Sequence, residues 1–182
     1  MNLESIFLRA LEPRDLDVLF EIENENEFWK YSNRTEPFSK NVLRNYIEQQ
    51  HQDIFEVKQK RFVLSDANSN VLGFVDLFDF EPIHRRVGVG IVVHQTKRGL
   101  GLGKKGLMLL DLHCKTHLNI HCLYANIAAE NKTSLRIFEH CGYEKVGIKK
   151  AWNFYQGAFH DEFLYQKLLN KMTMHSLTTL NY

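Results

Sequence analysis

Glycine and basic residues are concentrated in one short stretch of this 182-residue chain. None of the ten glycines precedes Gly73, and six of them fall between residues 88 and 106. An apolar run ends just before the string Arg98-Gly99-Leu100-Gly101-Leu102-Gly103-Lys104, and a helical pattern begins within it. The first amides of a helix lack intrahelical partners, and glycines let a phosphate approach them closely. The stretch therefore predicts a phosphate or pyrophosphate site.

Two other glycine-loop motifs fit this string less well. Residues 101–106, GLGKKG, have the GxGxxG spacing of dinucleotide-binding folds. That motif requires an acidic residue about twenty positions further on, where Ala125 and Asn126 stand instead. A Walker loop fails because Arg98 occupies the place of its first glycine and Lys105 follows Lys104. A dinucleotide-binding oxidoreductase is thus an alternative that rests on GLGKKG alone.

The wider spacing of motifs resembles one acyltransferase superfamily. The pattern Arg98-x-x-Gly101-x-Gly103 is similar to the RxxGxG acyl-CoA loop of the GCN5-related N-acetyltransferases (GNAT). Residues 131–143, NKTSLRIFEHCGY, resemble the segment NxxSxxxaaxxxGF/Y that follows this loop in the family. Three further segments resemble the branch of this family that contains the ribosomal-protein-alanine and spermidine acetyltransferases. They are LRALEPRDL at residues 8–16, IHRR at 83–86 and FHDE at 159–162. The ordered set covers residues 6–169.

This resemblance implies a fold, a reaction and a cofactor. The fold is a single α/β domain over residues 1–169, with a mixed, mostly antiparallel sheet, a splayed central strand and helices on both faces, followed by a tail at 170–182. The reaction is direct transfer of the acetyl group of acetyl-CoA to a primary amine of a polyamine, a protein N-terminus or a small molecule. Pantetheine would lie along Ile91, Val92 and Val93, and the pyrophosphate would bind the amides of residues 98–104. Asn131 would contact the cofactor arm, or serve simply as a helix N-cap.

Phe138 departs from the family pattern, because many members place a tyrosine there to protonate the departing thiolate. Ser134 matches a serine of the ribosomal-protein branch and is the substitute that we favour; Tyr143 is a second candidate, and a thiolate can also leave through solvent. Ser134 and Phe138 are both expected to contact the cofactor. Because of Phe138, a CoA-binding module without catalysis remains an alternative. The sequence does not single out the base that neutralises the amine; its candidates are Asp76, Asp79, Glu81 and Glu130.

Charge is unevenly distributed along the chain. Residues 1–50 contain ten acidic and six basic residues, whereas residues 84–117 contain seven basic residues and one acidic residue. We expect an anion at the glycine loop and a cationic acceptor at the acidic N-terminal part. The corresponding segment lines the acceptor site in members of the resembled family, so the predicted substrate-binding residues are Glu25, Glu27, Trp29 and Tyr31.

Regular elements must position these side chains. Apolar patterns predict strands at residues 6–11, 62–64, 71–77, 87–93, 121–128, 143–148, 151–155 and 162–169. Helical periodicity predicts helices after Asp15, after Ser39, from about Gly103 to His117, and from Asn131 to a stop at Gly142. Residues 24–39 show no regular period. Gly88 and Gly90 inside a strand predict a bulge or a close backbone approach, with Gly90 as the bulge position, and Gly106 predicts close packing of its helix.

Composition excludes several classes of protein. Hydrophobic residues make up 44% and charged residues 25%, which is typical of a globular domain, and no apolar run reaches eighteen residues, so no membrane span is expected. A formal net charge of +1 argues against nucleic-acid binding. The three cysteines form no CxxC pair, which is typical of a reducing, cytoplasmic location. His113 and His117 share a helix face without further ligands nearby, so no metal site is expected. A homo-oligomer is left open.

Overall fold

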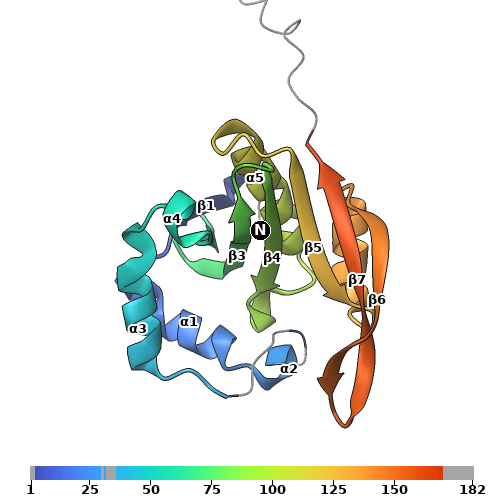
Figure 1. Ribbon diagram of the computed structural model, residues 1–182. Helices are drawn as coiled ribbons and strands as arrows, with labels where there is room; N and C mark the ends of the chain where they lie inside the picture. Colours follow the sequence, from blue (N-terminus) through green and yellow to red (C-terminus); the bar gives the residue numbers. More distant parts are fainter. Residues whose placement is uncertain (1–2, 30, 32–35, 170–182) are drawn as a thin grey trace, which may run out of the picture.

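The strands of the protein form a single seven-stranded sheet in the order β1-β2-β3-β4-β5-β7-β6 (Figure 1). The computed structural model describes residues 3–29, 31 and 36–169. The strands are β1 (Phe7–Ala10), β2 (Lys60–Ser65), β3 (Val71–Glu81), β4 (Arg86–Val93), β5 (Cys122–Ala128), β6 (Glu144–Tyr155) and β7 (Ala158–Leu168). All neighbours pair antiparallel except β4 and β5, which run parallel. The predicted mixed, mostly antiparallel sheet is confirmed.

Helices cover both faces of this sheet. They are α1 (Leu16–Glu23), α2 (Asn26–Trp29), α3 (Lys40–Glu48), α4 (Ile54–Val57), α5 (Leu102–Thr116) and α6 (Lys132–His140), joined by short 3₁₀ turns. Val63 and Phe74 of the sheet pack with apolar residues of α1 and α3, whereas their neighbours Leu64 and Val75 pack with residues of α5 and α6. Because successive strand side chains point to opposite faces, the two helix pairs lie on opposite sides, as predicted.

The central pair of strands separates soon after it begins. β4 and β5 share three registered positions: Arg86 with Cys122, Val87 with Leu123 and Gly88 with Tyr124. Beyond Gly88, β4 remains paired with β3 as far as Val93, and β5 remains paired with β7 as far as Ala128. Each strand therefore keeps its outer partner while the inner edges move apart. This is the splayed central strand that the resemblance predicts.

Aromatic side chains fill the point at which β4 and β5 separate. Phe78 of β3 pairs with Gly88, and its ring covers that glycine so closely that an added Cβ would overlap the ring. The same ring meets Tyr124 of β5 edge-on, with 6.0 Å between the ring centroids. The close approach at Gly88 is therefore made by a side chain, whereas the sequence predicted a backbone there. Gly90 is regularly paired with Asp76, so the predicted bulge at Gly90 is wrong; the irregularity in this pair of strands lies between Phe78 and Glu81.

Three other glycines behave as the sequence predicts. Gly142 has a φ of 82° and ends α6 in the left-handed region. Gly106 of α5 lies against the sheet, where an added Cβ would stand 2.7 Å from Cδ1 of Ile91. Gly101, with a φ of 76°, precedes the first residue of α5. The tight packing at Gly106 sets α5 directly behind β4, so the start of the helix is held at the end of that strand.

The structure differs from the sequence prediction at helix α2 and at strand β6. The segment 24–39, predicted without regular structure, contains the one-turn helix α2. The two strands predicted between residues 143 and 155 form the single strand β6, whose register shifts between Lys149 and Asn153. Ala151, which lies at this irregularity, has a φ of 48°. The predicted tail at 170–182 lies outside the described residues.

A glycine-to-alanine pair tests the packing that holds β4 in place. Gly73 of β3 is opposite Val93, and an added Cβ would overlap the backbone oxygen of Val92, which cannot rotate away. We expect Gly73→Ala to lower the free energy of unfolding by about 1–3 kcal/mol in urea denaturation. In the control Gly147→Ala, the added carbon would be 3.7 Å from Cβ of Leu164, so stability should stay within about 0.5 kcal/mol. Equal effects of the two substitutions would contradict this packing.

Candidate active site

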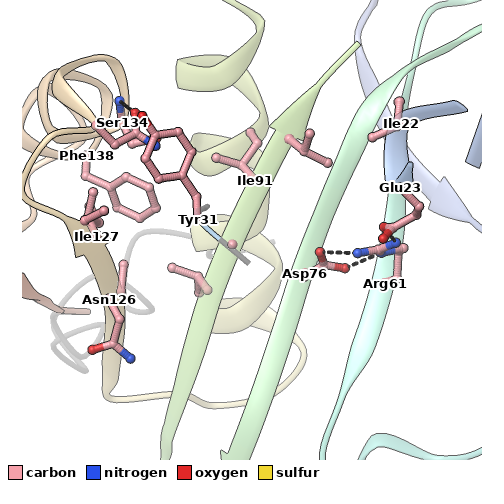
Figure 2. Close-up of a pocket in the computed structure, with 16 residues that line it drawn as sticks. Ile22, Glu23, Tyr31, Arg61, Asp76, Ile91, Asn126, Ile127, Ser134 and Phe138 are labelled. Atoms are coloured by element: carbon pink, nitrogen blue, oxygen red, sulfur yellow. Dashed lines mark hydrogen bonds and ion pairs between the residues drawn. The ribbon is translucent and has the colours of Figure 1, made fainter. Parts of the chain in front are cut away.

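The gap between β4 and β5 opens into a cavity of about 260 Å³. Its walls come from both strands, from the start of α6, from the end of α1 and from side chains of β2 and β3. The lining residues are Ile22, Glu23, Tyr31, Arg61, Asp76, Val89, Gly90, Ile91, Val92, Ala125, Asn126, Ile127, Ala128, Asn131, Ser134 and Phe138. Figure 2 shows Ser134 and Phe138 at one end of this cavity and the charged side chains of Glu23, Arg61 and Asp76 at the other.

Within the described part of the chain, the edge of β4 that faces this cavity has no strand partner beyond Gly88. In an antiparallel pair, the backbone groups of alternate residues point away from the partner strand. Between Val89 and Val93, those groups point into the gap because β5 has already separated from β4. The predicted cofactor positions Ile91 and Val92 line the cavity, and Val93 follows at the end of the strand. An extended chain with its own amides can therefore pair with this edge.

The glycine loop lies between the end of β4 and the start of α5. Gly99 and Gly101 have φ values of 78° and 76°, a region that side chains other than glycine rarely adopt. Gly101 stands at the N-cap position of the 15-residue helix α5, whose first amides lack partners within the helix. The macrodipole adds partial positive charge at the same point. This geometry suits a bound phosphate, as predicted.

The side chain of Arg98 points toward the acidic N-terminal segment. Its Nη2 donates to both carboxylate oxygens of Glu25 at 2.7 and 2.8 Å. Its Nη1 lies 3.8 Å from the Glu27 carboxylate, and its Nε donates to the backbone oxygen of Val93 at 3.2 Å. Glu25, predicted to bind substrate, is therefore placed against the glycine loop and does not line the cavity. The sequence separation of 73 positions gave no sign of this pairing.

Three predicted site residues lie at the N-cap of α6 or within this helix. The side-chain oxygen of Asn131 accepts a hydrogen bond from the backbone N–H of Ser134 at 3.0 Å, so Asn131 is the N-cap of α6. Asn131, Ser134 and Phe138 all line the cavity. Phe138 is 3% exposed and packs edge-on against Tyr143, with 4.9 Å between the ring centroids. The N-cap role is therefore compatible with a place in the cavity wall.

Tyr143 is excluded as a proton donor in this cavity. Its hydroxyl donates to Oδ1 of Asp111 at 2.9 Å, and its side chain is 2% exposed. Burial, followed by the neighbouring Asp111 carboxylate, raises the pKa of Tyr143 far above its ordinary value. Asp111 is also bound by Lys167 at 2.6 Å. The tyrosine thus belongs to a buried polar cluster between α5 and the sheet.

A buried ion cluster forms the other end of the cavity. Arg61 donates to both carboxylate oxygens of Asp76, at 2.6 and 2.7 Å, and also to Glu23. The side chains of Arg61, Glu23 and Asp76 are 14%, 6% and 25% exposed. Burial opposes the charge of Arg61, but the Asp76 carboxylate outweighs it and raises the pKa of the guanidinium. Within the cluster formed by these three described side chains, two carboxylates share one guanidinium, so the cluster has one more negative than positive formal charge.

The remaining candidate bases are engaged elsewhere. Glu130 accepts from Tyr155 at 3.0 Å and lies 2.6 Å from Nδ1 of His160. Asp79 accepts from the hydroxyl of Tyr124 at 3.3 Å. Neither of these carboxylates lines the cavity, nor does Glu81. Of the four candidates, Asp76 alone lies in its wall. The sequence interpretation missed Arg61, although a lone arginine at the start of an apolar strand is a usable signal for a buried ion pair.

A larger groove of about 970 Å³ continues from the cavity between α2 and the β6–β7 hairpin. The predicted acceptor residues Glu27, Trp29 and Tyr31 line it, and Tyr31 lines both hollows. The opposite wall consists of Lys149, Trp152, Asn153, Phe154, Tyr155, Gln156 and Glu162. Lys149 is itself paired with Glu162 at 2.9 Å. Aromatic faces and carboxylates are the groups that hold organic cations.

Other chemistry finds no support in the described part of the chain. No group of three or more histidine, cysteine, aspartate or glutamate side chains that could hold a metal occurs within residues 3–29, 31 and 36–169. Burial raises the pKa of the Cys114 thiol to about 12, which makes it a poor nucleophile. Among the described helices, none is long and apolar enough to cross a membrane.

Comparison with known proteins identifies the family to which the chain belongs. Residues 5–144 match the acetyltransferase (GNAT) domain family, and the chain belongs to this family. It is 28% identical to a spermidine N(1)-acetyltransferase of Vibrio cholerae over 90% of this chain and 95% of that protein. It is 25% identical to an uncharacterised prophage-derived N-acetyltransferase, YokL, of Bacillus subtilis, over 87% and 86% of the two chains.

A solved structure gives the same result. The Vibrio cholerae spermidine N-acetyltransferase in complex with CoA and spermine superposes with a TM-score of 0.83 at 26% identity, covering 91% of this chain and 96% of that one. The protein is an acetyl-CoA-dependent N-acetyltransferase that transfers the acetyl group to an amine. The two alternatives, an oxidoreductase and a CoA-binding module without catalysis, find no support in these comparisons.

Substitution of Arg61 tests whether the ion cluster stabilises the protein and whether its two carboxylates are charged. Arg61→Met leaves two adjacent, largely buried carboxylates, so we expect about 3–5 kcal/mol of destabilisation at pH 7.5. Protonation of one carboxylate relieves their repulsion, so the difference from the wild type should shrink as the pH falls toward 5. The exposed Arg44 on α3 is the matched control, and Arg44→Met should change stability by less than about 0.5 kcal/mol. A loss for Arg61→Met that is independent of pH would contradict the charge assignment.

Proposed function

We propose that this protein acetylates a polyamine of the spermidine class, using acetyl-CoA. The observation that carries the proposal is the continuity of two hollows: the β4–β5 gap leads directly into a groove lined with aromatic rings and carboxylates. The gap suits the thioester arm, and the groove suits an elongated cation. The names of the relatives, two of which are spermidine acetyltransferases of Vibrio cholerae and Escherichia coli, support the same acceptor class.

The cofactor is assigned to the gap and the glycine loop. The pyrophosphate would accept hydrogen bonds from the amides of residues 98–104, with Lys104 adding positive charge. The pantetheine arm would pair with the open edge of β4 at Ile91, Val92 and Val93. Asn131, Ser134 and Phe138 would contact the same arm from the start of α6. The geometry that supports this is the single cavity wall that these strand and helix residues share.

The reaction follows from this placement. The neutral amine nitrogen attacks the thioester carbonyl carbon, and the developing oxyanion is stabilised by an inward-pointing amide of β4. The negative end of the cavity, with Asp76 at its more exposed side, attracts the ammonium form of the acceptor and receives its proton through water. A covalent acyl-enzyme is not part of this scheme, because direct attack needs no protein nucleophile.

The acceptor is assigned to the groove. Glu27 would bind a cationic nitrogen of the polyamine, while Trp29 and Tyr31 would supply aromatic faces to its methylene and ammonium groups. Glu25 is reassigned: its bidentate pairing with Arg98 makes it a support for the loop rather than a ligand of the amine.

We also propose a domain organisation, self-association and a cellular location for the protein. Residues 1–169 would form one catalytic domain and 170–182 an appended tail. Self-association is supported by a dodecameric structure of the spermidine N-acetyltransferase of Vibrio cholerae, which is 27% identical, and by exposed apolar side chains on β6 and β7. The three free cysteines support a reducing, cytoplasmic location.

An acceptor panel tests the substrate class. With acetyl-CoA as donor, CoA release and mass spectrometry should show acetylation of spermidine with kcat/KM at least about fivefold above that of butylamine. The reason is that one additional ionic contact in the groove is worth about 1 kcal/mol or more. The advantage should shrink at high salt, because exposed charge pairs are screened. Preference for an amino-terminal peptide over every polyamine would contradict the proposal.

Two aspartate substitutions test the loop assignment. Gly101→Asp places a carboxylate where the pyrophosphate would bind, so the affinity for acetyl-CoA should fall on the order of 10–100-fold in calorimetric titration. Gly157→Asp is the matched control, because Gly157 has the same φ of 76° and no atom within 4 Å of an added Cβ. The control should bind acetyl-CoA within about threefold of the wild type. Undiminished binding by Gly101→Asp would remove the loop from the cofactor site.

A further inference from the structure

Release of CoA requires a proton. Aminolysis of a thioester expels a thiolate, and an ordinary thiol has a pKa of about 8.5. A phenol, with an ordinary pKa of about 10, is close enough in acidity to protonate the departing sulfur, whereas an aliphatic alcohol is a far weaker acid. A side chain in the cavity wall that protonates this thiolate should therefore be a phenol.

Hydroxyl groups are scarce in this wall. Among the described residues that line the cavity, two carry a hydroxyl: Tyr31 and Ser134. Phe138 lies in the same wall but has no exchangeable proton. Tyr143, the tyrosine nearest to Phe138 in the sequence, donates its hydrogen bond to the buried Asp111. The phenol of this cavity is therefore that of Tyr31.

Tyr31 comes from the acceptor side of the site. Figure 2 shows its side chain pointing toward Ser134 and Phe138 of α6. Tyr31 also lines the larger groove together with Glu27 and Trp29, so it borders both the thioester gap and the amine groove. It is 38% exposed, which lets the phenol exchange protons with solvent.

We propose that Tyr31 protonates the thiolate of CoA, a task for which α6 offers no phenol in this chain. The proposal deepens the proposed reaction and rests on acetyl transfer, not on the identity of the amine. Ser134 then contacts the thioester without being its acid. Tyr31, the proton donor, lies in the segment that lines the amine groove. One part of the chain therefore both binds the acceptor and protonates the departing CoA.

The proton and electron movements balance. The amine nitrogen uses its lone pair to form the C–N bond, and the carbonyl π electrons move to oxygen. When the tetrahedral adduct collapses, the C–S bond breaks and its electron pair moves to sulfur. The Tyr31 hydroxyl gives its proton to that sulfur, and CoA leaves as a thiol. The phenolate regains, through water, the proton that the new amide nitrogen loses.

Removal of one hydroxyl tests this role. Tyr31→Phe should lower kcat about 100-fold while the dissociation constant for acetyl-CoA, measured by calorimetry, stays within threefold of the wild type. The double variant Tyr31→Phe/Phe138→Tyr returns a phenol to the same cavity from α6 and should recover at least tenfold of the lost kcat. The decline of kcat at alkaline pH should be present in the wild type and absent from Tyr31→Phe, since only the protonated phenol can donate.

Two further variants serve as comparisons. Ser134→Ala should lower kcat less than tenfold. Tyr165→Phe removes a phenol that donates to Glu139 outside the cavity and should leave kcat within threefold of the wild type. The proposal is overturned if Tyr31→Phe keeps the wild-type kcat, if its affinity for acetyl-CoA falls as much as its kcat, if the double variant is no faster, or if Ser134→Ala is the slower single variant.

The test of Tyr31 does not depend on which amine is the acceptor. If the wild type acetylates butylamine but no polyamine, the proposed substrate class fails, and the Tyr31 comparison is made with butylamine because every amine expels the same thiolate.

Discussion

The early separation of β4 and β5 is the constraint on which the rest of the structure depends. The two strands share three registered positions and then follow different partners, β3 and β7. A free strand edge inside a sheet exposes unpaired backbone groups and would ordinarily invite aggregation. Here the opening is narrow at its base, where the ring of Phe78 covers Gly88 and meets Tyr124. The aromatic contact fixes where the strands part, and the hydrogen-bonding edge beyond it becomes a surface for an extended ligand.

The charged groups are arranged along the same opening. The glycine loop and the start of α5 provide amides and a positive helix end beyond Val93. The ion cluster of Arg61, Glu23 and Asp76 provides net negative charge at one end of the cavity. A donor with an anionic handle and an acceptor with cationic nitrogens therefore encounter opposite potentials at different places. This separation of charge suits a reaction between an anionic thioester and a cationic amine.

Local features of the site could be predicted from the sequence, and long-range ones could not. The left-handed Gly142, the start of α5 close to Gly103, the N-cap at Asn131 and the tight position at Gly106 depend on neighbouring residues or on one packing contact. The pairing of Arg98 with Glu25 and the burial of Tyr143 against Asp111 depend on residues 73 and 32 positions away. The helix α2 was missed because a single turn has too few residues to show a period. Apolar patterning thus predicted the strands and the family resemblance predicted their sheet, whereas the partners of charged and hydroxyl-bearing side chains required the fold.

The contact between Arg98 and Glu25 links the glycine loop, to which we assign the nucleotide, with the segment to which we assign the amine. Arg98 belongs to the glycine loop, and Glu25 immediately precedes α2, which carries Glu27 and Trp29. A phosphate that drew Arg98 away would break two short hydrogen bonds and release the start of α2. Linkage is reciprocal, so an amine that altered the position of Glu25 would change the affinity for the nucleotide by the same factor. The contact between Arg98 and the acidic residues before and within α2 would therefore couple the affinities for the two substrates without any further contact between their sites.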